Sequence, residues 1–236
     1  LTPLTVISAS ADSICHDHPD MQTHVSLIHN NINRLTRMLR QILEVRKAQA
    51  GKLKLQVSEG YIGDFCKEAC MSLVPIFSQK EITFNQYISC IGEKAWFDSD
   101  KVEKILYNLL SNAVKYSHNG GRVDVSVAIS GNAAEIKVED NGIGMSKEKL
   151  KHLYNRFLDG DYRKMNVMGT GIGLSLVNDL VKLHHGKITC HSVEGEGTAF
   201  TVTLPIGKDS YSEEEISKAP MAVVQSTDIN SPMNEA

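Results

Sequence analysis

The spacing of apolar residues changes near residue 50, and this change separates two kinds of structure. Ahead of it, five aliphatic residues recur in steps of four, three, four and three: Ile28, Ile32, Leu35, Leu39 and Ile42. That spacing is the heptad seam of a helix that packs along another helix. Beyond it, Leu53, Leu55 and Val57 alternate with polar residues, as in a strand with one buried face. The sequence therefore predicts a helical unit followed by a mixed α and β unit.

Residues 1–50 are expected to form a helical hairpin. A first apolar stripe runs from Leu1 to Ile14, and Pro19 then disfavours helix within the segment 16–20. Two helices joined by so short a connection lie antiparallel. A hairpin of this size cannot bury two apolar seams by itself, so we expect it to pair with a second copy into a four-helix bundle.

The two periodicities alternate in the rest of the chain, which predicts an α+β domain over 51–206. A helix through 104–117 should be capped by Asp98 or Ser99. Further helices are expected over 62–79 and 171–185, and strands over 82–89, 94–97, 122–130, 134–140, 187–193 and 198–206. The polar, aperiodic segment 145–168 predicts no regular element. The composition of 207–236 predicts a linker, with a short helix as an option at 213–219.

Composition argues against several classes of function. The formal net charge of -3 provides no basic field for direct nucleic-acid binding. No apolar run approaches the roughly 18–20 residues of a membrane span, and no signal peptide opens the chain. Because the first residue is Leu, we expect the sequence to be part of a longer protein. The cysteines, odd in number and without a CxxC pair, are expected to be reduced in a cytosolic setting: Cys15, Cys66, Cys70, Cys90 and Cys190.

The helix through 104–117 carries an unusual polar stripe. Asn108, Asn112 and Lys115 follow each other at spacings of four and three, so they share one helix face, which we call the asparagine stripe. Asparagine is a mediocre helix former because its amide competes for backbone hydrogen bonds. The stripe is either a solvated face or a face turned toward a ligand.

Three glycine-bearing segments accompany the stripe: DNGIGM at 140–145, GTGIGLS at 169–175 and GEGTAF at 195–200. Each alone would be an ordinary turn, since glycine accepts positive φ. GTGIGLS fits neither a dinucleotide fingerprint, which needs glycine where Leu174 stands, nor a P-loop, which needs a Gly-Lys pair. The HRD sequence of eukaryotic-type kinases is absent as well. What remains is a glycine-rich turn that opens a helix, whose N–H groups can bind phosphate.

The residues around these turns suit a nucleotide. Asp140, at a strand end, can accept a hydrogen bond from an exocyclic amine such as that of adenine. Gly142 and Gly144 would let a flat ring approach the backbone. Asn112 offers an amide oxygen to Mg²⁺, and Lys115 offers positive charge to phosphate.

Taken together, the order and spacing of these segments resemble the N, G1, G2 and G3 boxes of the sensor histidine kinases. That family shares its ATP-binding fold, the Bergerat α/β sandwich, with gyrase B, Hsp90 and MutL. The resemblance covers residues 50–206 and implies a domain that binds ATP and Mg²⁺.

The resemblance also implies roles for individual residues. Asn112 would hold Mg²⁺ and Asn108 would lie near the phosphates. Lys115 would contact phosphate and Tyr116 adenine, while Asp140 would bind adenine beside Thr198. HLYNRF at 152–157 resembles the F box that begins the ATP lid, in which Arg163 or Lys164 would approach phosphate. The remaining residues implied in ATP binding are Gly142, Gly144, Gly169, Thr170, Gly171, Gly173 and Leu174.

One position distinguishes members of the superfamily. Gyrase-type ATPases carry a glutamate one helical turn before the Mg²⁺-binding asparagine, where this chain has Asn108. An amide cannot act as a general base, so we expect ATP to be bound without efficient hydrolysis. The alternatives are a gyrase-like ATPase and an ATP-binding pseudokinase that acts as a dimeric scaffold.

The N-terminal hairpin resembles the dimerisation and histidine-phosphotransfer domain of the same kinases. LTPLT at 1–5 matches the end of the H box, which places the phosphoacceptor histidine three residues before Leu1. This implies that the chain as given does not autophosphorylate, and that Thr2 occupies the position associated with phosphatase activity. The other histidines are expected to be solvated or packed, with weak metal options at His16–His18 and His184–His185.

The segment 207–236 resembles the linker to a receiver domain in hybrid sensor kinases. The resemblance as a whole implies a two-component phosphotransferase that forms a homodimer and passes phosphate to an aspartate of a response regulator, here fused C-terminally. It implies a cytoplasmic segment of an inner-membrane sensor protein, with no membrane or nucleic-acid contact of its own.

Overall fold

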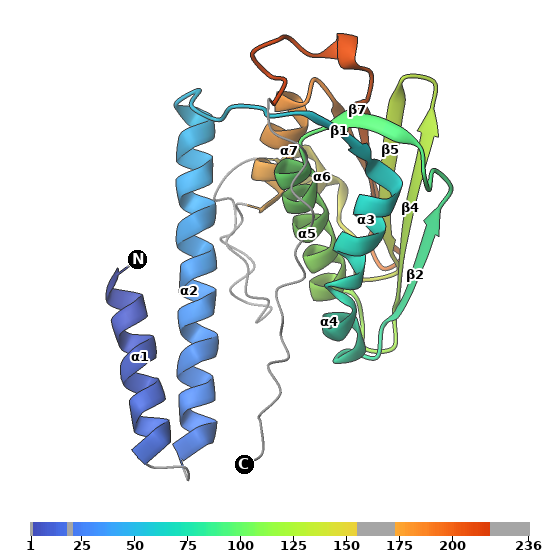
Figure 1. Ribbon diagram of the computed structural model, residues 1–236. Coiled ribbons are helices and arrows are strands. Elements are labelled where there is room, and N and C mark those ends of the chain that lie inside the picture. The colour runs from blue at the N-terminus through green and yellow to red at the C-terminus, as the bar shows by residue number, and fades with distance from the viewer. Residues whose placement is uncertain (1, 18–20, 155–172, 218–236) are drawn as a thin grey trace.

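The computed structural model describes residues 2–17, 21–154 and 173–217. Two helices, α1 (Thr2–Asp17) and α2 (Gln22–Gln49), lie side by side at the N-terminus and run in opposite directions (Figure 1). The two helices of the predicted hairpin are therefore present, although α1 continues through residues 16 and 17, where the break was expected to begin. Along the heptad seam Ile32 is buried, whereas Leu35 is 48% exposed, Leu39 43% and Ile42 41%. The single chain thus covers little of the C-terminal half of its seam.

The second unit is built on a five-stranded sheet of order β2-β4-β5-β7-β6. The parallel pair β2–β4 lies at one edge, and the other neighbours are antiparallel. A separate antiparallel pair joins β1 to β3. The strand bounds are β1 (Ser58–Tyr61), β2 (Thr83–Ile88), β3 (Lys94–Phe97), β4 (Arg122–Ser130), β5 (Ala133–Asp140), β6 (Lys187–Val193) and β7 (Gly197–Pro205).

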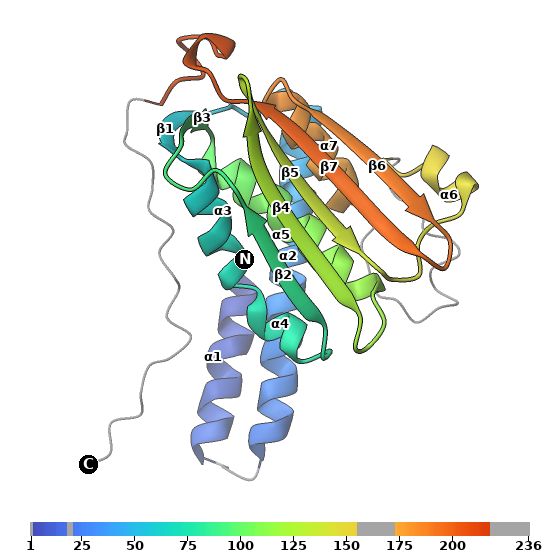
Figure 2. The same ribbon diagram turned by 90° about the vertical axis from the view of Figure 1, so that its right-hand side faces the viewer.

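Helices cover one face of this sheet. Figure 2 shows α3, α5 and α7 behind the strands, while no described element covers the face toward the viewer. The helix bounds are α3 (Ile62–Met71), α4 (Val74–Ser78), α5 (Ser99–Tyr116), α6 (Lys147–Lys151) and α7 (Gly173–Leu183), followed by a 3-10 turn at Lys208–Ser210. The unit is therefore an α/β sandwich with one open sheet face, in agreement with the predicted α+β class.

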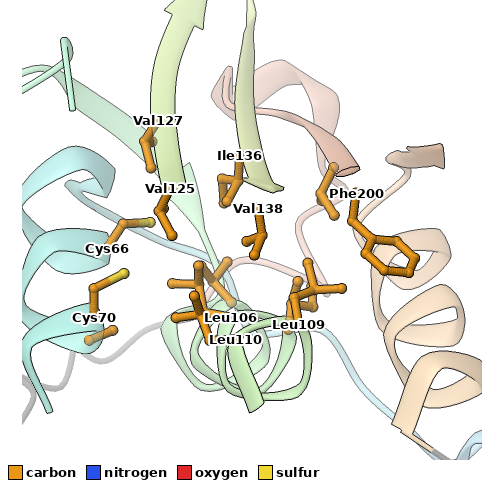
Figure 3. Packing of buried hydrophobic residues seen from close by; sticks show 14 of the residues in the cluster. Cys66, Cys70, Leu106, Leu109, Leu110, Val125, Val127, Ile136, Val138 and Phe200 are labelled. Atoms are coloured by element: carbon orange, nitrogen blue, oxygen red, sulfur yellow. The ribbon is translucent and has the colours of Figure 1, made fainter. Parts of the chain in front are cut away.

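The core lies between α5 and the sheet. Leu106, Leu109 and Leu110 point from α5 toward the strands (Figure 3) and are each at most 1% exposed. They meet inward-facing residues of β4 and β5, such as Val125 and Ile136, in one buried cluster. Burial of such aliphatic side chains contributes about 1.5–3 kcal/mol each. This packing fixes which face of α5 is left for the asparagine stripe.

Asp98, one of the two predicted capping residues, is the N-cap of α5. Its carboxylate accepts hydrogen bonds from the backbone N–H of Lys101 at 3.2 Å and of Gln56 at 2.8 Å. Its own N–H donates to Nε2 of the buried His184 at 3.3 Å, while Nδ1 of that ring lies 3.1 Å from the carbonyl of Leu180. Since Nε2 accepts, Nδ1 carries the proton and the ring is neutral. Burial lowers the pKa of His184, which identifies it as a packed histidine.

Three expected elements differ from the structure. The alternating segment 53–57 forms no strand in a ladder; Leu55 and Val57 are buried, but only Val57 makes a bridge, to Ile216. The helix expected over 62–79 is split into α3 and α4, because Pro75 cannot donate the hydrogen bond that a continuous helix requires. A short helix, α6, lies in the segment for which no element was expected, where Ser146 caps it through Lys149 N–H at 3.4 Å.

The C-terminal segment, defined here as residues 207–217, packs against the sandwich. Tyr211 is buried with Leu55 and Val57, and its hydroxyl donates to the carbonyl of Pro205 at 2.5 Å. Val57 N–H donates to the carbonyl of Glu215 at 2.8 Å. The beginning of the predicted linker is therefore bound to the extended residues that lead from α2. The optional helix at 213–219 is absent over its described part, 213–217, which forms turns and a bridge.

The hairpin also contacts the sandwich directly. Lys104 of α5 forms an ion pair with Glu44 of α2 and a second with Asp100. Val45 of α2 is buried and belongs to the main core cluster. Among the described helices, none combines the length and apolar character needed to cross a membrane. The described thiols Cys66, Cys70, Cys90 and Cys190 are free.

Removing the C-terminal segment should destabilise the sandwich. A chain that ends at Ile206 loses the buried ring of Tyr211 and the bridge to Val57, which we expect to lower the free energy of unfolding by about 2–4 kcal/mol. Urea denaturation followed by circular dichroism measures this. A chain that ends at Ser217 is the matched control and should keep full stability. Equal stability of the two truncated chains would contradict the assigned packing.

Candidate nucleotide-binding site

The asparagine stripe on α5 lies against the beginning of α7. Asn108 is only 6% exposed, and its Nδ2 donates to the carbonyl of Lys104 at 2.7 Å. A Cβ placed on Gly173 would lie 2.8 Å from Oδ1 of Asn108, so the first residue of α7 lies against this amide. Asn112 and Lys115 are partly buried. The stripe is thus not a freely solvated face, because its first residue lies in the contact between two helices.

The loop after β5, residues 141–144, lies against the last residue of α5. A Cβ on Gly142 would come within 2.3 Å of the carbonyl oxygen of Tyr116, and Ile143 N–H donates to that same oxygen at 3.1 Å. Only glycine allows so close an approach. The first glycine-bearing segment, DNGIGM, is therefore attached to the end of the helix that carries the asparagine stripe.

The third glycine segment closes the other side of this loop. Gly144 has φ +60°, and a Cβ there would lie 1.9 Å from the carbonyl oxygen of Val193. Gly195 N–H donates to the carbonyl of Ile143 at 2.8 Å. The loop is therefore held between α5 and the turn that connects β6 to β7.

Asp140 and Thr198 lie directly opposite each other on β5 and β7. The Asp140 side chain accepts a hydrogen bond from Gly142 N–H at 2.9 Å. The Thr198 hydroxyl lies 2.9 Å from that of Ser192, which also donates to the carbonyl of Gly197 at 2.8 Å. The predicted pairing of the acidic residue with the threonine is thus produced by the register of the sheet.

Burial raises the pKa of Asp140 to about 6. Its side chain is 9% exposed, and desolvation disfavours the charged form. Hydrogen bonds from the backbone of Gly142 and Thr198 act in the opposite direction, and the nearby charge of Glu139 adds to the rise. The same region raises the pKa of the Cys190 thiol to about 12, through burial and the charge of Asp140. A bound group that donates a hydrogen bond to the carboxylate of Asp140 would therefore favour its charged form.

Lys115 and Tyr116 form a polar pair at the C-terminal end of α5. Nζ of Lys115 donates to the hydroxyl of Tyr116 at 2.8 Å and lies 4.5 Å from the centre of its ring. Cations are attracted both to such hydroxyls and to aromatic faces. The pair places a positive charge and an aromatic ring on the turn of α5 whose backbone contacts the loop 141–144.

Gly173 and Leu174 form the first turn of α7, and Leu174 packs against the core. The predicted residues Arg163, Lys164, Gly169, Thr170 and Gly171 lie outside the described residues, as does the second half of the F box, 155–157. Within the described residues no group of three or more His, Cys, Asp or Glu gathers into a metal site. His184 is packed as described above, and His185 instead pairs with Glu215 at 2.9 Å.

Comparison with known proteins agrees with this geometry. Residues 97–208 match the family described as histidine kinase-, DNA gyrase B-, and HSP90-like ATPases. An uncharacterized sensor-like histidine kinase from Rhizobium meliloti is 30% identical over 94% of this chain, and the sensor histidine kinase WalK of Bacillus subtilis is 30% identical over 91%. The chain contains the ATP-binding domain of a sensor histidine kinase. It spans 44% and 35% of the length of these two relatives.

A solved structure supports the fold of both units. The full-length structure of ShkA, determined in complex with AMPPNP, superposes with a TM-score of 0.74 over 87% of this chain and 43% of that one, at 21% identity. The family match begins at the end of β3 and extends to the start of the C-terminal segment. The ATP-binding domain thus contains every described residue predicted to bind the nucleotide.

Two residues that support the site, Ser192 and Lys80, escaped the prediction. Ser192 contacts Thr198, and its position opposite that residue could have been found by aligning the β6 and β7 segments as a hairpin. Lys80 donates to three carbonyls at the C-terminal end of α5. Nothing in the local sequence indicates this, because the two segments are more than thirty residues apart.

Asp140 should make the stability of the nucleotide-free domain depend on pH. Its pKa is raised, so the folded state keeps the proton longer than the unfolded state, and stability falls as pH rises from about 4 to about 6. Asp140→Asn removes this loss while its amide oxygen still accepts from Gly142. The free energy of unfolding of the variant relative to the wild type should increase by up to about 3 kcal/mol between pH 4 and pH 7.

Urea denaturation across this pH range measures the difference. Asp209→Asn, at an exposed aspartate, is the control and should leave the pH dependence unchanged. A constant difference between Asp140→Asn and wild type from pH 4 to pH 7 would show that Asp140 titrates normally.

Proposed function

We propose that the chain is a histidine kinase core, which binds Mg·ATP and transfers its γ-phosphate to a histidine and then to an aspartate of a response regulator. The proposal rests on the contacts that α5, the loop 141–144 and the β6–β7 turn make with one another around the buried carboxylate of Asp140. These segments belong to the ATP-binding domain of a sensor histidine kinase.

The base of the nucleotide would lie at Asp140. A desolvated carboxylate that accepts backbone hydrogen bonds from Gly142 and Thr198 still has lone pairs for the exocyclic amine of adenine. Thr198 lies opposite, with a hydroxyl that can donate or accept. The close contact of Gly142 with the carbonyl of Tyr116 fixes the loop 141–144 beside Asp140, where the flat ring would lie.

The phosphates would lie along the asparagine stripe toward α7. The amide oxygen of Asn112 suits Mg²⁺, which takes few protein oxygens and completes its shell with phosphate and water. Lys115 adds positive charge, and the N-terminal end of α7 beside Asn108 adds backbone N–H groups and the positive end of the helix dipole. When bound, Mg²⁺ neutralises phosphate charge, which lowers the barrier to phosphoryl transfer.

Asn108 supports transfer over hydrolysis. Its amide has no basic lone pair, so it cannot deprotonate water. Its side chain donates to the carbonyl of Lys104 and lies against Gly173, which also limits where water could be activated. Catalysis by this chain would then rest on positioning and charge stabilisation.

The acceptor side of the reaction would be formed by a dimer. The C-terminal half of the α2 seam exposes Leu35, Leu39 and Ile42 in the single chain, and a second copy would bury them in a four-helix bundle. Thr2 would take the phosphatase position, and the phosphoacceptor histidine would lie ahead of Leu1. We further propose that this chain is the cytoplasmic part of a membrane-anchored sensor and that a receiver domain follows residue 236.

Isothermal titration of the chain with ATP, with and without Mg²⁺, tests the nucleotide site. Asn112→Ala should weaken Mg·ATP binding about tenfold or more while changing Mg²⁺-free binding little, because only the metal contact is removed. Asn31→Ala, at an exposed asparagine of α2, is the matched control. Full Mg·ATP affinity in Asn112→Ala would contradict the metal assignment, and no binding by the wild type would contradict the proposed nucleotide site itself.

Incubation with γ-labelled ATP tests the fate of the phosphate. We expect neither steady ATP turnover nor acid-labile labelling of the chain, because it lacks both a general base at position 108 and the H-box histidine. A fragment that includes the residues ahead of Leu1 should become labelled. Rapid phosphate release by the chain would favour a gyrase-like ATPase, and acid-labile labelling of the chain itself would place the acceptor among its own histidines.

A further inference from the structure

The last turn of α5 presents four carbonyls that have no partner within the helix, as at every helix end. These carbonyls also carry the negative end of the helix dipole. One of them, on Tyr116, accepts from Ile143 N–H at 3.1 Å. The others must find donors elsewhere if the turn is to keep its position.

A single ammonium group supplies those donors. Nζ of Lys80 lies 2.8 Å from the carbonyl oxygen of Val114, 3.3 Å from that of Lys115 and 3.1 Å from that of Ser117. An ammonium has three N–H donors, which matches the three acceptors. Hydrogen bonds from a charged donor are stronger than neutral ones.

Lys80 is itself fixed at its backbone. It follows α4, where Phe77 is 1% exposed and stacks on Phe84 with ring centres 4.2 Å apart. Lys80 N–H donates to the carbonyl of Phe77 at 3.1 Å, and its own carbonyl accepts from Gly120 N–H at 3.2 Å. The next residue, Glu81, has φ +57°, a left-handed conformation that tertiary contacts must hold. The ammonium is therefore attached to a rigid part of the sandwich.

We infer that Lys80 is a positioning residue for the nucleotide site. It holds the end of α5 from one side while the loop 141–144 holds it from the other, and this sets the distance from Lys115 and Tyr116 to Asp140. Without Lys80, three carbonyls turn to water, the last turn of α5 frays, and the two nucleotide-binding residues on it lose their fixed position. The inference rests on the proposed nucleotide site and assigns no direct contact with ATP to Lys80.

The variants Lys80→Met, Lys80→Gln and Lys80→Arg test this. Lys80→Met keeps the apolar stem and removes the donors, and should weaken Mg·ATP binding about tenfold at a temperature well below its unfolding midpoint. Lys80→Arg keeps the charge and the donors and should restore most of the affinity. Lys137→Met, at a partly exposed lysine on the open sheet face, is the matched control and should bind like the wild type.

Amide hydrogen exchange provides a second measurement that needs no nucleotide. Lys80→Met should speed exchange at residues 114–117 and leave the first turns of α5 unchanged. If Lys80→Met does not fold, Lys80→Gln, which retains two neutral donors, takes its place in both measurements.

The outcomes separate the two proposals. Unchanged affinity in the folded Lys80→Met protein, with only a lower unfolding midpoint, would overturn the inference by showing a purely structural role. Weak binding that Lys80→Arg does not restore would also overturn it. Absence of nucleotide binding in the wild type would overturn the proposed function and the inference with it.

Discussion

Burial of one face of α5 against the five-stranded sheet is the contact on which the rest of this molecule depends. The leucines of that face fill the space above β4 and β5, so the opposite face and both ends of the helix have little freedom of placement. At the beginning, Asp98 binds the N-terminal turn, the segment that leads from α2 and the buried His184. At the end, Lys80 and Ile143 account for four carbonyls. A helix fixed in this way can carry binding residues with little loss of order when a ligand arrives.

The site differs from a generic polar surface because the backbone segments that form it pack closely against one another. Gly142, Gly144 and Gly197 each approach backbone so closely that a Cβ would overlap it. Close packing removes water from Asp140 and raises its pKa to about 6. The same desolvation that destabilises the empty site makes the carboxylate a stronger acceptor for a ligand that supplies a donor. The free protein thus loses stability at Asp140, the residue that we propose binds the nucleotide base.

The contact between the C-terminal segment and the extended residues 53–57 has a structural consequence. The chain leaves the hairpin through these residues and leaves the sandwich through the C-terminal segment, and the two paths meet at Val57 and Ile216. Tyr211 fills the space between them with Leu55. The joint between hairpin and sandwich is therefore built partly from residues beyond the last strand of the sheet.

The sequence by itself determined the type of most elements, and it predicted the segments that we propose to bind the nucleotide. Periodicity and capping residues act over a few positions, so β3, α5 with Asp98 as its cap, and the β4–β5 hairpin could be predicted locally. The division of 62–79 at Pro75 was also within reach, because proline has a local effect. Tertiary structure alone decided that Lys80 binds the end of α5, that Asn108 is buried against Gly173, that Asp140 has a raised pKa, and that 207–217 packs on 53–57. Each of these features depends on contacts between segments that are far apart in the chain and on the exclusion of water by their packing. No local sequence pattern indicates either of these.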